Sequence, residues 1–235
     1  MPKALRAGLE TYWTTFGTGP RPALAIHCSL AHAGSWAGLA AKLGKRLTIT
    51  AFDLPGHGES APWQEDMGEV QGRSVDVAAA LAADLGDGGG PVDLLGHSFG
   101  ATVALRLAVE HPRRVRSLVL IEPVFFAVAF ADDPGARARY EARMAVYTQA
   151  MASGDREAAA RAFIELWGDG RAWDALPRLH RAALARDIPL IDAAAPALCD
   201  DIGGLLVPGV LQAVDCPVLL IGGSQSPAIT EAIHE

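Results

Sequence analysis

The sequence predicts an α/β fold in which a mostly parallel, doubly wound sheet carries a helical insertion. Short apolar runs alternate with Ala-rich stretches of helical spacing, which is typical of parallel strands joined by right-handed crossovers. Half of the 235 residues are hydrophobic, so the chain can form one sizeable core. Between about residues 125 and 214 the alternation stops and only helical patterns remain. We therefore expect a core made of residues 1–123 and 215–235, with a helical cap at 124–214.

The strands are predicted from short β-branched or apolar runs that end in turn residues. The run at 115–121 is almost continuously apolar, as in a strand that is covered on both faces. The helix that follows residue 100 stops before His111-Pro112, since proline cannot continue it. The expected strands are 11–16, 23–27, 47–52, 92–95, 115–121 and 217–221, and the expected helices are 74–85, 101–110, 136–151 and 156–167.

Charge and composition exclude several classes of protein. A net charge of −7 and a pI near 5.5 argue against binding to nucleic acid. The odd count of three cysteines favours a reducing compartment, and the seven histidines show no zinc-ligand spacing. No apolar run suits a signal peptide or a membrane span. We expect a cytoplasmic protein without metal, cofactor or membrane partner, acting on a small molecule as a monomer or homodimer.

A serine lies on a sharp turn between a strand and a helix. Gly96-His97-Ser98-Phe99-Gly100 follows the strand at 92–95 directly and precedes the helix at 101–110 directly. Such a turn lifts the serine Oγ out of the sheet, and glycines flank it because side chains would collide with the tight backbone. A helix-capping serine is the structural alternative. The context favours Ser98 as a nucleophile.

At this point the chain resembles the α/β-hydrolase family. The stretch from His27 to Leu30, with Trp36 beyond it, is similar to the family's oxyanion loop, and Asp53-Leu54-Pro55-Gly56-His57-Gly58-Glu59-Ser60 is similar to the turn after the family's next strand. The insertion at 124–214 is similar to its cap. The resemblance, which runs from about residue 10 to the end of the chain, implies the α/β-hydrolase fold.

The resemblance also implies roles for particular residues. Ser98 would be the nucleophile, and the backbone N–H groups of Ser29 and Phe99 would form the oxyanion hole. Cys28 stands where the family usually has glycine, which restricts φ beside the first of these donors. The oxyanion loop and the apolar run at 124–130 are expected to supply substrate contacts, from Leu30, His32, Phe125 and Phe126.

The triad acid is not at its usual place. In the family it follows the strand at 217–221, but Ser226 occupies that position here. Some branches of the family carry the acid at the end of the preceding strand instead, where this chain has Glu122. A carboxylate beside so apolar a strand is costly without a partner, which favours a role for it. We expect Glu122 to be the triad acid.

The triad base has no clear candidate in the sequence. The family order is Ser, acid and then His, with the histidine after one more strand. The sequence ends at Glu235 within a helical pattern, and His234 on that helix is the weaker alternative. We expect the catalytic histidine to lie beyond Glu235, in a polypeptide longer than 235 residues.

The residues predict a serine hydrolase that cleaves a small carboxylic ester, lactone or thioester through an acyl-Ser98 intermediate. A serine nucleophile argues against dehalogenase or epoxide-hydrolase chemistry, which uses a carboxylate in this fold. The alternatives are a lyase, carbon–carbon hydrolase or perhydrolase of the same fold, or a catalytically silent binding protein.

Overall fold

The computed structural model describes residues 2–86 and 89–234 of the chain. Positions 1 and 235, the outer ends of the core ranges expected from the sequence, lie outside the described residues. Seven strands in the described part form one sheet in the order β1-β2-β4-β3-β5-β6-β7. Their bounds are β1 Lys3–Arg6, β2 Leu9–Phe16, β3 Arg21–Ile26, β4 Leu47–Phe52, β5 Val92–His97, β6 Val115–Ile121 and β7 Val218–Ile221.

The sheet is antiparallel at one edge and parallel elsewhere. Strands β1, β2 and β4 pair antiparallel, whereas β4, β3, β5, β6 and β7 pair in parallel. This confirms the mostly parallel sheet that the apolar runs predict. Strand β1 was not expected, because its four residues, Lys3–Arg6, are mostly exposed and lack an apolar pattern.

Helices cover both faces of the sheet and form a layer beyond its carboxyl edge. They are α1 Ala37–Leu43, α2 Val70–Leu85, α3 Phe99–Glu110, α4 Phe126–Asp132, α5 Ala136–Ala152, α6 Arg156–Trp167, α7 Arg178–Asp187, α8 Pro189–Cys199 and α9 Ala228–His234. None of the helices within residues 2–86 and 89–234 combines the length and apolar character needed to cross a membrane.

Alternate residues of β3 face two different hydrophobic clusters. Leu24 and Ile26 pack in the larger cluster with α2 and α3, whereas Ala23 and Ala25 pack with Trp36 and α1 on the other face. Side chains of a strand alternate between faces, so a strand buried on both sides must be apolar at every position. The last four residues of β3 are fully buried, which explains its unbroken apolar run.

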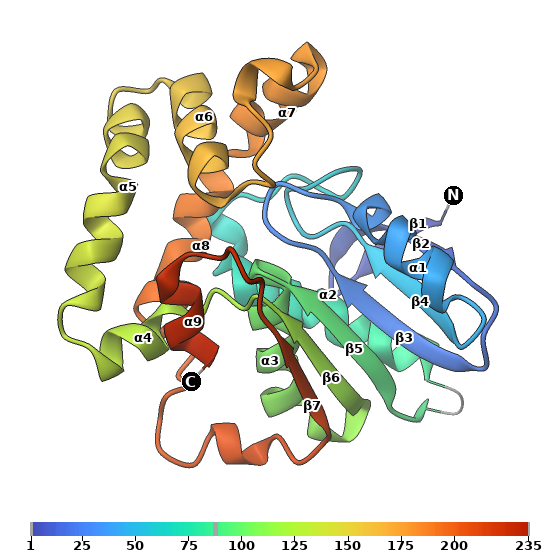
Figure 1. The fold of residues 1–235 in the computed structure, drawn as a ribbon. Helices are drawn as coiled ribbons and strands as arrows, with labels where there is room; N and C mark the ends of the chain where they lie inside the picture. The colour runs from blue at the N-terminus through green and yellow to red at the C-terminus, as the bar shows by residue number, and fades with distance from the viewer. Residues whose placement is uncertain (1, 87–88, 235) are drawn as a thin grey trace.

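Helices α4 to α8 form a cap above the carboxyl ends of the parallel strands (Figure 1). Helices α5, α6 and α7 bury a small core of their own, which includes Met144, Tyr147 and Leu184. After α8 the chain runs back beside α3, where Leu205 packs near Leu105 and Val109. The final part of the expected cap range, after residue 199, therefore contacts the core helix α3.

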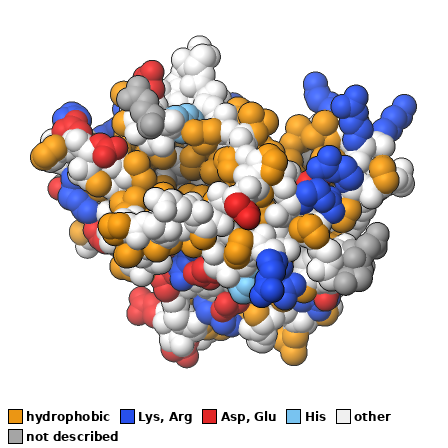
Figure 2. All heavy atoms as spheres, turned by 90° about the horizontal axis from the view of Figure 1, so that it is seen from below, with side chains coloured by type: hydrophobic (Ala, Val, Ile, Leu, Met, Phe, Trp, Pro, Cys, Tyr) orange, Lys and Arg blue, Asp and Glu red, His pale blue; other side chains and the backbone are white. Residues whose placement is uncertain are grey.

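Strand β7 is the least buried strand of the sheet's parallel part. All four of its side chains are exposed, from 39% at Leu220 and Ile221 to 55% at Leu219. Hydrophobic side chains also reach the surface among charged ones on the face seen from below (Figure 2). In the described part of the chain, β7 pairs with β6 alone and forms one edge of the sheet.

Candidate active site

Ser98 sits at a strained turn between β5 and α3. Its φ of 54° and ψ of −117° are unusual for a residue with a side chain. The Ser98 N–H donates to the carbonyl of Ile121 at the end of β6, over 2.8 Å, and this bond anchors the turn to the neighbouring strand. The geometry is that of a nucleophile elbow, with the serine raised at the carboxyl edge of the sheet.

The two glycines of the elbow are required by close backbone contacts. A Cβ at Gly96 would lie 2.4 Å from the carbonyl oxygen of Gly100. A Cβ at Gly100 would lie 2.3 Å from the carbonyl oxygen of Ile26 and 2.4 Å from that of His27. Helix α3 therefore starts in direct contact with the end of β3, which brings the elbow next to residues 27–30, the loop that the sequence predicts to be the oxyanion loop.

The oxyanion loop turns sharply at Leu30, whose φ is 61°. The Leu30 N–H donates to Nε2 of the buried His57 over 3.1 Å, so it is not available to a substrate. The Ser29 N–H makes no hydrogen bond to another group of the described residues, and neither does the Phe99 N–H at the start of α3. These are the two backbone donors expected to hold an oxyanion.

Two buried histidines support the loop from below. His27 Nε2 accepts from the Leu54 N–H, and its Nδ1 lies 2.7 Å from the carbonyl oxygen of Cys28. His57 Nδ1 lies 3.1 Å from the carbonyl oxygen of Pro55. An Nε2 that accepts must be unprotonated, and Nδ1 then donates to the carbonyl, so both rings are neutral. Burial lowers the pKa of His57 and lowers that of His27 further. Neither ring is free to act as a general base.

Glu122 follows β6 and faces the end of β7. Its backbone is also left-handed, with φ of 46°, and its N–H donates to the carbonyl of Ile221 over 2.8 Å. Its Oε1 accepts a hydrogen bond from the Ser226 hydroxyl and one of 3.2 Å from the Gly223 N–H. A Cβ at Gly223 would lie 2.7 Å from Oε1, so a side chain at this position would displace the carboxylate from this contact. Ser226, which occupies the position where the sequence comparison expected the acid, thus contacts the carboxylate of Glu122.

Three other carboxylates that follow the cap helices, Asp200, Asp201 and Asp215, lie outside the cavity. Asp200 pairs with Arg137 on the protein surface. Asp201 accepts hydrogen bonds from the Leu205 and Leu206 N–H groups. Neither they nor Asp215 line the cavity that contains Ser98, whereas Glu122 does.

No histidine in residues 2–86 and 89–234 hydrogen-bonds to Ser98 or Glu122. His32, His97 and His180 line the cavity, but His32 Nδ1 accepts from the Gly34 N–H. Burial lowers the pKa of His97, while the charge of Glu122 acts in the opposite direction. His234 packs against Gly222 and does not line the cavity.

A cavity of about 1820 Å³ lies between the cap and the carboxyl edge of the sheet. Ser98 and Glu122 share it with the oxyanion loop and with apolar side chains of α4, α5, α6 and α8. Phe126 packs against Tyr140 and Trp167 on one wall in tilted arrangements, with ring centroids 4.6 and 5.6 Å away. Of the site residues expected from the sequence, those that line the cavity are Ser29, Leu30, His32, Ser98, Glu122 and Phe126.

Phe125 is a correction to the sequence prediction, because it does not line the cavity. It is 2% exposed and packs with Ala127 and Leu205 in a separate cluster. Phe125 precedes the first turn of α4 with a non-helical backbone (φ −79°, ψ 73°), and its side chain points into this cluster, whereas the Phe126 side chain lines the cavity. The Phe99 side chain is likewise buried in the core, and only its N–H is expected at the site.

Cysteine and metal chemistry have little support in the described residues. Burial raises the pKa of the Cys28 thiol to about 11, so it stays protonated near neutral pH and is a poor nucleophile. No group of three or more His, Cys, Asp or Glu side chains there is arranged to hold a metal ion. The site is organised around Ser98.

Comparison with known proteins identifies the family to which this sequence is related. The sequence matches the Alpha/beta hydrolase family over residues 23–235. Lipase LipV of Mycobacterium tuberculosis is 42% identical over 109 residues, which are 45% of this chain and 38% of the lipase. Pimeloyl-[acyl-carrier protein] methyl ester esterase of Neisseria meningitidis is 31% identical over 197 residues, 79% of this chain and 69% of the esterase.

The matches differ in how much of each relative they cover. The chain spans 38%, 32% and 44% of the length of three curated relatives that it matches. Among solved structures, a thermophilic esterase from Thermogutta terrifontis has a TM-score of 0.69 at 22% identity, over 99% of this chain and 85% of that chain. At this identity the likeness shows the shared fold.

Proposed function

Because the chain belongs to the alpha/beta hydrolase family, we propose that it is a serine hydrolase that cleaves a carboxylic ester, lactone or thioester. The observation that carries the proposal is the strained Ser98 elbow, which shares one cavity with Glu122 and the oxyanion loop. Relatives named as a lipase and as methyl ester esterases support an ester bond as the target.

In the proposed reaction, Ser98 Oγ attacks the carbonyl carbon and its proton passes to an imidazole that Glu122 orients. The oxyanion of the tetrahedral intermediate is held by the free N–H groups of Ser29 and Phe99. The imidazolium gives its proton to the leaving alcohol or thiol, and the C–O or C–S bond breaks. Water then attacks the acyl-Ser98 ester by the same steps, which releases the acid and restores the serine.

The cavity supports a substrate with an apolar portion of considerable length. Its volume of about 1820 Å³ exceeds the roughly 300–1,000 Å³ typical of sites for drug-sized molecules. Phe126, Tyr140 and Trp167 form an aromatic wall beyond the elbow. We propose that an acyl or alcohol chain lies along this wall while its carbonyl reaches Ser98.

The test is covalent labelling combined with turnover. A fluorophosphonate should label Ser98, and the enzyme should hydrolyse p-nitrophenyl esters. Ser98→Ala should lower kcat by about 10⁶-fold, since the serine and the imidazole act as a unit. Labelling at another residue, with Ser98→Ala still active, would show that Ser98 is not the nucleophile.

A second candidate is a binding protein that has the pocket but not the catalysis. The observation that favours it is that, within the described residues, no imidazole hydrogen-bonds to Ser98. The same phosphonate separates the two candidates, because a silent protein would leave Ser98 unlabelled. A lyase, carbon–carbon hydrolase or perhydrolase of this fold would be labelled but would differ in its products.

A further inference from the structure

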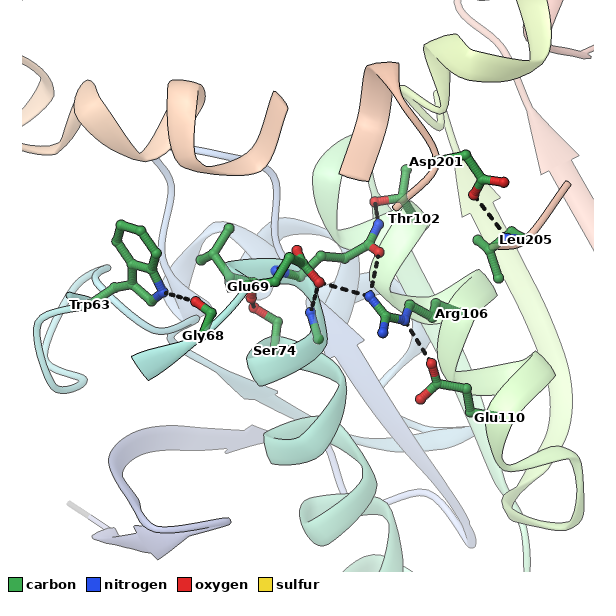
Figure 3. A network of polar contacts seen from close by, with 12 residues as sticks. Trp63, Gly68, Glu69, Ser74, Thr102, Arg106, Glu110, Asp201 and Leu205 are labelled. Carbon is green, nitrogen blue, oxygen red and sulfur yellow. Dashed lines mark hydrogen bonds and ion pairs between the residues drawn. The ribbon is translucent and has the colours of Figure 1, made fainter. Parts of the chain in front are cut away.

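A network of polar side chains connects the start of helix α2 to Thr102 and Arg106 of helix α3 (Figure 3). Gln71 is 1% exposed and Thr102 is fully buried. The Gln71 side-chain amide donates to the Thr102 hydroxyl over 3.0 Å, and this hydroxyl donates to the carbonyl oxygen of Phe99 over 2.7 Å. This series of hydrogen bonds therefore ends at Phe99, the residue whose N–H is the proposed oxyanion donor.

At its other end, this series of hydrogen bonds starts from the guanidinium group of Arg106, which two carboxylates fix in place. Arg106 donates to Gln71 Oε1 over 3.2 Å, to Glu69 over 2.8 Å and to Glu110 over 2.7 Å. Glu69 also caps α2 by accepting from the Gln71 and Gly72 N–H groups. Each group thus donates to the next, from Arg106 through Gln71 and Thr102 to the Phe99 carbonyl. Hydrogen bonds connected in series in this way polarise and strengthen one another.

Thr102 holds both peptide groups that flank Phe99. Its hydroxyl bonds to the Phe99 carbonyl, and its backbone N–H donates to the Ser98 carbonyl over 3.3 Å. The Ala101 N–H donates to the same Ser98 carbonyl over 3.0 Å. In a trans peptide the C=O and N–H point in opposite directions, so these bonds aim the Phe99 N–H away from the helix.

We propose that Gln71 and Thr102 are positioning residues, which fix the Phe99 N–H in the direction needed to hold the oxyanion. This inference rests on the proposed hydrolase function. Bonds from a threonine hydroxyl to its own helix are common, so the argument depends on the continuation through Gln71 to Arg106. A donor of the oxyanion hole contributes to the transition state and little to substrate binding, so its misplacement should lower kcat and leave KM unchanged.

The experiment uses the full-length enzyme and a p-nitrophenyl ester, with an arylboronic acid as a probe that forms a tetrahedral adduct. Thr102→Val and Gln71→Met should each lower kcat about 10-fold or more, since small displacements of catalytic groups are costly. The affinity for the boronic acid should fall by the same factor, and KM should stay within about twofold.

Thr102→Ser retains the hydroxyl and should keep parental kcat. The double variant should lose no more than the worse single variant, because the two residues act in series.

Ser74→Ala is the matched structural control. Ser74 is also fully buried, and its hydroxyl bonds to the Val70 carbonyl within α2 without reaching α3. It should lower thermal stability but leave kcat unchanged. If Thr102→Val does not fold, Gln71→Met and Thr102→Ser decide the question.

Two results would overturn the inference. One is a parental kcat in Gln71→Met or Thr102→Val. The other is an equal loss of kcat in Ser74→Ala at a similar loss of stability. Ser98→Ala, assayed in parallel, separates the proposals: its inactivity beside an active Thr102→Val refutes the positioning role alone, whereas its full activity refutes the hydrolase mechanism.

Discussion

Glu122 is the acidic side chain whose surroundings best match the role of orienting an imidazole. It lines the cavity with Ser98, and one carboxylate oxygen is held by Ser226 and the Gly223 N–H. Within the described residues, no hydrogen bond engages the second oxygen of this carboxylate, Oε2. The carboxylate is thus fixed on one side and free on the other.

We predict that Glu122→Gln lowers kcat by about 10²–10⁴-fold with the fold intact. The amide keeps the shape but removes the charge that stabilises an imidazolium. Steady-state kinetics with an activated ester measures the loss. Ser226→Ala, which removes one support but keeps the charge, should cost much less. Parental activity in Glu122→Gln would mean that another group is the triad acid.

The buried histidines predict how stability depends on pH. Burial lowers the pKa of both His27 and His57 in the folded protein, whereas the unfolded chain titrates near pH 6.5. Below that pH the unfolded state binds protons that the native state does not, so the free energy of unfolding falls. The expected slope is up to about 1.4 kcal/mol per pH unit for each histidine, with no loss from these groups above pH 6.5.

Urea unfolding at pH 7.5 and at pH 5.5 measures this slope. His57→Gln should flatten it, while His180→Gln on exposed α7 should leave it unchanged. An equal slope in the His57→Gln variant and the parent would show that His57 does not contribute.

At the scale of single elements, the start of α3 is limited by its contact with β3. A Cβ at Gly100 would lie 2.3 Å from the Ile26 carbonyl oxygen, and backbone cannot move aside cheaply. We predict that Gly100→Ala lowers the free energy of unfolding by more than about 2 kcal/mol and abolishes activity. Gly38→Ala is the control: within α1 its Cβ would meet nothing within 4 Å, so it should stabilise the protein by about 0.5–1 kcal/mol. Chemical denaturation compares the two variants, and similar stabilities would refute the steric argument.

The elements that the sequence predicted best are those with strong apolar or helical patterns. Strand β6 and helix α6 have the predicted limits, Val115–Ile121 and Arg156–Trp167. Helix α1 was missed, since it is only seven residues long and Ala40 is its one buried residue, so no apolar stripe of helical spacing marks it. In the same way the run at 124–130 shows that a helix is apolar without showing which residue faces the cavity, and this is why Phe125 was misplaced.

The sequence predicts the site where one short motif determines the local backbone, as at Ser98. It does not predict contacts between segments that are far apart in the sequence. The bond between Ser226 and Glu122 joins residues 104 positions apart, and that between Gln71 and Thr102 joins residues 31 apart. Both depend on how β6 meets β7 and how α2 meets α3, and no local pattern encodes those contacts. The pair Gly222-Gly223 was the available signal, because adjacent glycines after a strand indicate a close approach.

At the scale of the whole molecule, the exposed strand β7 should control self-association of the 235-residue polypeptide. In the part of the chain that the structure describes, it is an edge strand with four apolar side chains between 39% and 55% exposed, and an edge of this kind can pair with another chain. We predict concentration-dependent association, measured by size-exclusion chromatography with light scattering. Leu219→Lys should raise the dissociation constant about 10-fold or more, because burying a leucine contributes about 1.5–3 kcal/mol. Leu179→Lys is the control, since Leu179 is 85% exposed on helix α7 and does not belong to the sheet. If both variants associate as strongly as the parent, the contact does not involve β7, and a parent that stays monomeric at high concentration would refute the prediction.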